Sequence, residues 1–167
     1  DGCWEVQVPG KTYFTYRPFD GLRLLLSDTL HLDGEPAHFD DMATLKAAYY
    51  ANLDRQIEAI YDRFTGVLNA AGPGEEWRWR EGAPCTVVSP FEGGCLEKGR
   101  GYWGGGPVYN VISPHIGGAP DVGNCFHAIE QLCFVEKKVG FDELMRIVKN
   151  DWEGEEALRQ YALRHYT

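Results

Sequence analysis

A run of three glycines at 104–106 leads directly into an apolar, β-rich segment over 107–113. Glycines in this position indicate that the backbone either approaches another segment closely or turns sharply into a buried strand. A second glycine-rich bend at 114–121 precedes a stretch with helical periodicity. Short strands that are reached through such turns and alternate with helices predict an α/β fold built from β-α units with parallel strands.

The glycine run does not match a nucleotide-binding loop. It leads into a strand rather than into a helix, and no Gly-Lys-Ser or Gly-Lys-Thr sequence follows it.

The clearest single element is a helix that ends near Ala71. Apolar residues from Leu45 to Leu68 recur at a period near 3.6, and Asp40 or Asp41 can cap the start. Shorter helices are expected over about 18–31 with Pro18 at the first position, over 91–98 ended by Gly99, over 122–133, after a cap at Asp142, and from about 153. The remaining predictions are a strand or an extended loop within the opening stretch 1–11, a loop over 10–17, a turn over 33–36 and a short β-branched segment over 83–89.

Composition and charge exclude several classes of function. The formal net charge is −9 and the longest basic cluster is Lys137-Lys138, which argues against a nucleic-acid partner. No apolar run approaches the roughly 18 residues of a membrane span, and no signal peptide is recognisable. We therefore expect one cytoplasmic domain that contacts neither membrane nor nucleic acid.

The cysteines are five in number: Cys3, Cys85, Cys95, Cys125 and Cys133. An odd number without Cys-x-x-Cys spacing indicates neither a disulfide framework nor a zinc site, so reduced thiols are expected. A metal cluster of Cys125, His127 and Cys133 is the alternative, but cysteines packed along a helix are common. No metal site is therefore predicted.

The opening segment brings a thiol and a carboxylate together. Side chains two residues apart on an extended backbone point to the same face, so Cys3 and Glu5 share a face and Trp4 lies opposite. Such a pair can form a reacting sulfur with an acid or base beside it. The alternative is a partly buried cysteine next to a surface glutamate. A cysteine hydrolase is not favoured, because none of the five histidines lies in a motif that would activate Cys3.

Four stretches of the sequence resemble the glycyl radical enzymes, the family of pyruvate formate-lyase and the glycerol and diol dehydratases. GCWE at 2–5 looks like the thiyl-radical loop of that family. A family segment that ends with an acidic residue followed by Cys-Ile-x-x-Gly is similar to SPFEGGCLEKGR at 89–100. A family strand with the sequence Gly-Gly-Ala-x-Tyr-Asn is similar to GGPVYN at 105–110. Residues 128–159 resemble the helices that follow, so order and spacing agree along nearly the whole chain.

The resemblance implies a fold, a helix-rich part of a ten-stranded α/β barrel with a Cys-bearing finger loop at its centre. Residues 1–167 are then a single fragment of the catalytic barrel, the half with the thiyl loop. The family's C-terminal motif, Arg-Val-x-Gly before Tyr or Phe, is absent from the sequence. The C-terminal glycine-radical domain is thus expected outside this chain, and the fragment alone is expected to be inactive.

The resemblance also implies a mechanism. A radical stored on a backbone glycine passes to Cys3, whose thiyl takes a hydrogen atom from a substrate carbon. The Cys-x-Glu spacing matches the eliminating and decarboxylating branches, in which the carboxylate, here Glu5, moves a proton. Trp4 departs from the small aliphatic residue usual there and indicates a subgroup other than the best-known dehydratases. His115 follows a strand at a glycine-rich bend, so it is a candidate for substrate binding, with a structural histidine as the alternative.

The implied partners are a small-molecule substrate and a radical-S-adenosylmethionine activating enzyme with an iron–sulfur cluster. No bound cofactor is expected, the full-length protein is expected to be a homodimer, and it would work anaerobically because oxygen destroys glycyl radicals. The substrate is not readable from the sequence, since Cys-x-Glu serves enzymes that break C–O, C–N, C–S and C–C bonds. A non-catalytic homologue that acts as a binding or assembly module is the competing hypothesis, and an Arg-Val-x-Gly segment downstream of Thr167 would decide against it.

Overall fold

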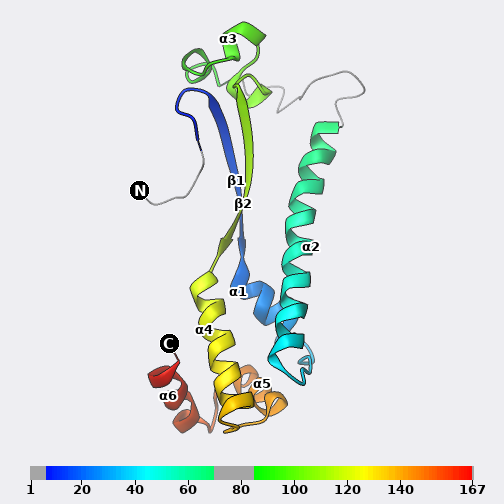
Figure 1. Ribbon diagram of the computed structural model, residues 1–167, viewed down its shortest axis with the longest axis vertical. Helices are drawn as coiled ribbons and strands as arrows, with labels where there is room; N and C mark the ends of the chain where they lie inside the picture. Colours follow the sequence, from blue (N-terminus) through cyan, green and yellow to red (C-terminus); the bar gives the residue numbers. More distant parts are fainter. Residues whose placement is uncertain (1–6, 70–84, 167) are drawn as a thin grey trace. The chain divides into compact units, whose positions relative to one another are not determined.

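The computed structural model describes residues 7–69 and 85–166 (Figure 1). The chain divides into two compact units, which we call unit 1 and unit 2. Unit 1 comprises residues 1–18 and 57–115, and unit 2 comprises residues 19–56 and 116–167. Both units are therefore assembled from segments that are distant in the sequence.

Two strands, β1 (Thr12–Asp20) and β2 (Tyr109–Gly117), form the sheet in the described residues. They run in the same direction, as the arrows in Figure 1 show. At one end the backbone N–H of Tyr109 donates to the Lys11 carbonyl at 2.9 Å, and at the other Gly117 lies beside the Phe19 carbonyl. Parallel strands need a long crossover connection, and here it contains a long helix. The predicted α/β organisation with parallel strands is confirmed.

The prediction of a loop over 10–17 was wrong for its greater part, because β1 begins at Thr12. Thr12 to Tyr16 are β-branched or aromatic residues that fit a pleated, half-buried surface. Pro18 does not begin a helix but lies within the strand, where a proline is tolerated if its missing N–H would not join the ladder.

The first helix therefore starts later than predicted. The Asp20 side chain caps α1 (Gly21–Arg23) by accepting from the N–H groups of Leu22 and Arg23 at 2.9 and 3.1 Å. The helix continues in a wider, π-helical form over Leu24–Thr29. The expected helix over 18–31 is thus confirmed in its central part.

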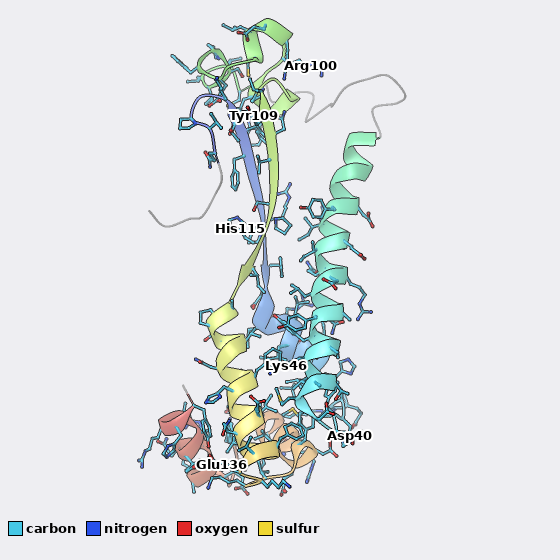
Figure 2. All side chains as sticks on the ribbon, in the orientation of Figure 1. Asp40, Lys46, Arg100, Tyr109, His115 and Glu136 are labelled. Carbon is cyan, nitrogen blue, oxygen red and sulfur yellow. The ribbon has the colours of Figure 1, made fainter. Side chains whose placement is uncertain are left out.

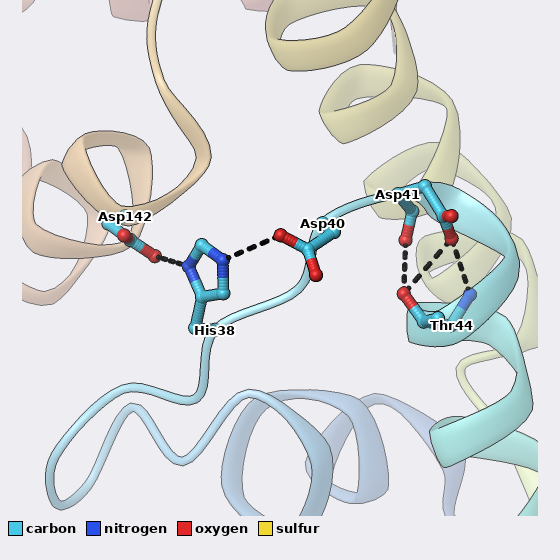
Figure 3. Close-up of polar contacts among 5 residues, drawn as sticks. All are labelled: His38, Asp40, Asp41, Thr44 and Asp142. Carbon is cyan, nitrogen blue, oxygen red and sulfur yellow. Dashed lines mark hydrogen bonds and ion pairs between the residues drawn. The ribbon is translucent and has the colours of Figure 1, made fainter.

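The long helix α2 (Met42–Asn69) is confirmed with its cap. Asp41 Oδ1 accepts from the Thr44 N–H at 2.8 Å, and the Thr44 hydroxyl donates back to the Asp41 carbonyl at 2.9 Å (Figure 3). The N-terminal part of α2 contributes Leu45 and Tyr49 to the core of unit 2. The predicted end at Ala71 lies outside the described residues.

Unit 1 contains short helical segments between the long helix and β2. They are a 3₁₀ turn (Ser89–Phe91), α3 (Cys95–Lys98) and a second 3₁₀ turn (Tyr102–Gly104). Gly99 ends α3 in the left-handed region at φ 61°, as predicted. The expected single helix over 91–98 was too long, because Gly93 and Gly94 separate the first 3₁₀ turn from α3. The described part of 83–89 forms turns that lead into the first 3₁₀ segment.

The C-terminal helices of unit 2 follow β2. They are α4 (Ala119–Ile129) with a π-helical continuation (Glu130–Val135), α5 (Phe141–Lys149) and α6 (Glu156–His165). Their apolar faces close the core around Leu25, Leu45 and Leu132, each 1% exposed or less. In residues 7–69 and 85–166, no helix has both the length and the apolar character to cross a bilayer.

Asp142 does not cap α5 as predicted, because Gly140 occupies the cap position. Its carboxylate instead accepts from His38 Nδ1 at 2.6 Å, while His38 Nε2 faces Asp40 at 3.1 Å (Figure 3). Two carboxylates on one imidazole favour its protonated form, because only the imidazolium donates from both ring nitrogens. The hydrogen bond to Asp142 raises the pKa of His38 most, and that to Asp40 raises it further.

The raised pKa of His38 predicts that the contact between helix α5 and the loop that precedes α2 depends on pH. The contribution of His38 to stability is fully present below its ordinary pKa of 6.5 and is lost as the pH rises through its folded value. His38→Gln is therefore expected to lower the unfolding temperature more below pH 6.5 than in mildly alkaline solution. Thermal unfolding of both proteins across this pH range measures the effect, and an equal difference at all pH values would contradict it.

Candidate functional site

Cys3 and Glu5 lie outside the described residues, so their predicted roles stay predictions. The structure does describe the chain that follows them. The Val8 N–H donates to the Thr12 hydroxyl at 2.9 Å, and the Lys11 N–H donates to the Val8 carbonyl at 3.0 Å. Gly10 lies in this turn at φ 70°. The chain after the predicted thiol and carboxylate therefore makes a tight turn that leads directly into β1.

This turn is attached to both sequence motifs at 89–100 and 105–110. The Gly93 N–H donates to the Gly10 carbonyl at 2.6 Å, and the Tyr109 N–H donates to the Lys11 carbonyl at 2.9 Å. The two motifs also bind each other, since the Val108 N–H donates to the Gly93 carbonyl at 3.1 Å. We call this place the glycine junction, which comprises Gly10–Lys11, Gly93–Gly94 and residues 106–109. All of it belongs to unit 1.

An aromatic cluster packs beside the junction, and the sequence patterns did not reveal it. Tyr13 of β1 is only 3% exposed, and its ring centroid lies 5.0 Å from that of Tyr102 and 5.6 Å from that of Trp103. The Phe14 N–H donates to the Tyr102 hydroxyl at 3.4 Å. Edge-to-face pairs of this kind add to the burial of apolar area. The cluster fixes the start of β1, and the only hint in the sequence was the density of aromatic residues at 13–16 and 102–103.

His115 lies within β2 rather than after it, which corrects its predicted place (Figure 2). The side chain is half-buried, and its ring packs edge-on against Phe14 at a centroid distance of 6.2 Å. Both residues belong to unit 1. This packing is compatible with either role that the sequence left open, so substrate binding by His115 stays a prediction.

Two buried acceptor atoms near the junction have no hydrogen-bond partner in the part of the chain that the structure describes. They are Glu92 Oε2 and Asn110 Oδ1. The Asn110 amide nitrogen, by contrast, donates to the Pro107 carbonyl at 3.3 Å. Buried acceptors are normally satisfied, so these two oxygens mark positions where a further donor would be stabilised. No pattern in the sequence singled out Glu92.

The cysteines at 95, 125 and 133 are packed against neighbouring side chains, as expected for structural residues. Cys95 is 3% exposed, and burial raises the pKa of its thiol, with the charge of Glu92 acting in the same direction. Burial also raises the pKa of Cys125 and that of Cys133, the latter to about 11. No group of three or more potential ligands in residues 7–69 and 85–166 could hold a metal ion.

Comparison with known proteins identifies the family. A family model described as pyruvate formate lyase-like matches residues 1–166. A (2S)-3-sulfopropanediol dehydratase from Klebsiella oxytoca is 34% identical over 122 residues, 70% of this chain and 14% of the relative. A trans-4-hydroxy-L-proline dehydratase from Clostridioides difficile is 26% identical over 170 residues, 94% of this chain and 20% of the relative.

Solved structures show the same fold. The glycerol-bound B12-independent glycerol dehydratase from Clostridium butyricum superposes with a TM-score of 0.73 at 23% identity, over 99% of this chain and 21% of its own. A structure that describes 1,2-propanediol dehydration in Roseburia inulinivorans superposes with a TM-score of 0.68 at 24% identity, over 98% of this chain and 21% of its own.

The chain belongs to the pyruvate formate lyase-like family, the glycyl radical enzymes, and the relatives named above are dehydratases. The resemblance of the sequence motifs to this family is thereby confirmed. The chain spans only 14% and 20% of the length of the two sequence relatives.

Proposed function

We propose that this chain carries the reacting thiol of a glycyl radical dehydratase, with Cys3 as the thiyl residue and Glu5 as its acid or base. The main support is the family match over residues 1–166 together with dehydratases as relatives. The structure adds that the turn after Cys3 and Glu5 is bonded to both motifs that the chain shares with the family. The relatives named above are dehydratases, so elimination of water is proposed rather than decarboxylation.

The proposed reaction removes water from a small hydroxylated substrate. The Cys3 thiyl takes a hydrogen atom, so that a C–H bond breaks, an S–H bond forms and the radical moves to carbon. In a substrate with hydroxyl groups on two neighbouring carbons, Glu5 takes the proton of the hydroxyl group on the radical carbon, and the C–O bond on the neighbouring carbon breaks. Glu5 then passes this proton to the departing hydroxide, which leaves as water. The product radical then recovers the hydrogen atom from Cys3. A glycyl radical outside this chain supplies the unpaired electron at the start.

We further propose that β1 and β2 are neighbouring strands of the family's ten-stranded barrel. In this proposal the segment with Cys3 is the finger loop inside it. The parallel pairing of β1 with β2 and the long helical connection are the local features of such a barrel. His115, on β2 with its ring against Phe14, is then a candidate to line the substrate cavity.

The remaining proposals concern the whole protein. It is expected to be a cytoplasmic, anaerobic homodimer that is activated by a radical-S-adenosylmethionine enzyme. Its substrate is expected to be a small hydroxylated molecule, because the relatives act on sulfopropanediol, hydroxyproline, glycerol or propanediol by name.

The test uses the full-length parent protein and its activating enzyme under anaerobic conditions. Electron paramagnetic resonance should show a glycyl radical after activation. Incubation with (2S)-3-sulfopropanediol, trans-4-hydroxy-L-proline, glycerol and 1,2-propanediol should show loss of water from at least one of them. A parent that acquires no glycyl signal would favour the binding module, and an activated parent that removes carbon dioxide instead of water would overturn the dehydratase assignment.

A further inference from the structure

The glycine junction depends on backbone contacts too close for any larger side chain. A Cβ atom on Gly106 would lie 2.2 Å from the Arg100 carbonyl oxygen and 2.7 Å from Cys95 Sγ. A Cβ atom on Gly94, which has φ 95°, would lie 2.7 Å from the Gly106 carbonyl oxygen. Two of these three contacts are with backbone atoms, which cannot rotate away. Glycine is therefore required at both positions for the two motifs to meet.

Side chains hold the same backbone from the outside. Lys98 Nζ donates to the Pro107 carbonyl at 2.9 Å, and this carbonyl also accepts from the Asn110 amide. The Glu97 carboxylate accepts from the Gly94 N–H at 2.9 Å. Three side chains of the two motifs thus fix the backbone that bonds Gly10 and Lys11, and a hydrogen bond from an ionised group is stronger than a neutral one.

The packing around Cys95 completes the junction. Its side chain is 3% exposed, and its Sγ lies only 2.7 Å from the position that a Cβ atom on Gly106 would occupy. A nearly inaccessible thiol cannot reach a substrate, so the chemistry of Cys95 is not used here. Its volume instead limits how far residues 106–109 can move toward α3.

From these contacts we infer that the glycine junction positions the segment with Cys3 and Glu5 for hydrogen-atom transfer, with Gly106 and Lys98 as positioning residues. This inference rests on the proposed function. Gly10 and Lys11 of the junction follow this segment in the sequence, and each is bonded to a separate motif, Gly10 to Gly93 and Lys11 to Tyr109. Because reaction requires the reacting atoms to approach to about 3–3.5 Å, a misplacement of 1 Å can cost about 10²-fold in rate.

Gly106→Ala in the full-length parent tests the inference, with Gly104→Ala as its matched control. Gly104 lies in the same glycine run, but a Cβ atom there would meet no described atom within 4 Å, and its φ is not left-handed. Gly106→Ala should speed hydrogen–deuterium exchange of the amides of Val8, Lys11, Val108 and Tyr109, each of which donates a hydrogen bond at or beside the junction. Gly104→Ala should leave them unchanged. This readout needs no activity.

The kinetic arm separates positioning from partial misfolding. Gly106→Ala should keep the glycyl radical signal within about twofold of Gly104→Ala while kcat falls by about 10- to 100-fold. The deuterium isotope effect on kcat, measured with a carbon-deuterated form of the accepted panel substrate, should rise because abstraction becomes limiting. Misfolding of a fraction of the molecules would lower radical content and kcat together and leave the isotope effect unchanged, and that result would overturn the inference.

Lys98→Met provides a second, milder variant if Gly106→Ala does not fold. It removes the hydrogen bond to Pro107 without adding an atom inside the junction, and the Lys98 side chain is exposed. We expect faster amide exchange, a larger isotope effect and a kcat lowered by about threefold, because one hydrogen bond is lost. An unchanged kcat and isotope effect would overturn the inference. Turnover that survives Cys3→Ala would instead overturn the proposed function, so the two failures are distinguishable.

Discussion

Cys3→Ala is expected to abolish turnover of the activated full-length protein and to leave its glycyl radical in place. Alanine has no S–H bond, so it cannot receive the radical or return a hydrogen atom to the product. In the proposed mechanism the radical is stored on a glycine outside this chain, so its formation does not need Cys3. Product formation and the radical signal are therefore measured on the same activated sample, and the expected result is a signal without product.

Cys85→Ala is the matched control for this prediction. Cys85 is half-buried, and its described contacts with Ser89 involve the Cys85 carbonyl, which the substitution keeps. Cys95 would be a poor control, because its sulfur packs against Gly106. Cys85→Ala should retain both the radical signal and turnover. Turnover by Cys3→Ala at the control rate would exclude Cys3 as the thiyl residue.

The helices of this chain could be predicted because their signals are local. The apolar repeat from Leu45 to Leu68 specifies one face of a helix, and Asp41 supplies an acceptor for its first N–H groups. Gly99 ends α3 because it tolerates a left-handed conformation. Period and cap are both written within a few residues, so no knowledge of the packing partner is needed.

β1 was mispredicted because its signal is not local. Thr12 to Tyr16 alternate only weakly between apolar and polar residues, so the segment was predicted to be a loop. What makes it a strand is pairing with β2, about a hundred residues later, and burial of Tyr13 against Tyr102 and Trp103. Tertiary contacts of this range override local propensity.

The glycine junction was predicted only in part. The run at 104–106 correctly indicated a close approach of the backbone, and Gly106 makes it. The sequence does not say which segment lies opposite, because Arg100, Cys95 and Gly94 belong to a separate turn. The family resemblance set the two motifs apart as segments but gave no contact between them. Cys3 and Glu5 were selected by their spacing and by that resemblance. Both lie outside the described residues, so their roles stay predictions.

Glu5→Gln is expected to separate hydrogen abstraction from loss of water. Glutamine has nearly the same shape as glutamate but cannot take a proton, and removal of a general acid or base typically costs about 10²- to 10⁴-fold in rate. Cys3 remains able to abstract and return hydrogen. In D₂O its exchangeable S–H becomes S–D, so unreacted substrate should gain deuterium while little product forms.

Glu58→Gln, at an exposed position on α2, is the control with full turnover. Product formed by Glu5→Gln at the rate of this control would assign the proton transfer to another group. Deuterium in the substrate without product would instead place Glu5 after the abstraction step, because the thiyl of Cys3 would already have acted on the carbon whose hydroxyl proton Glu5 removes.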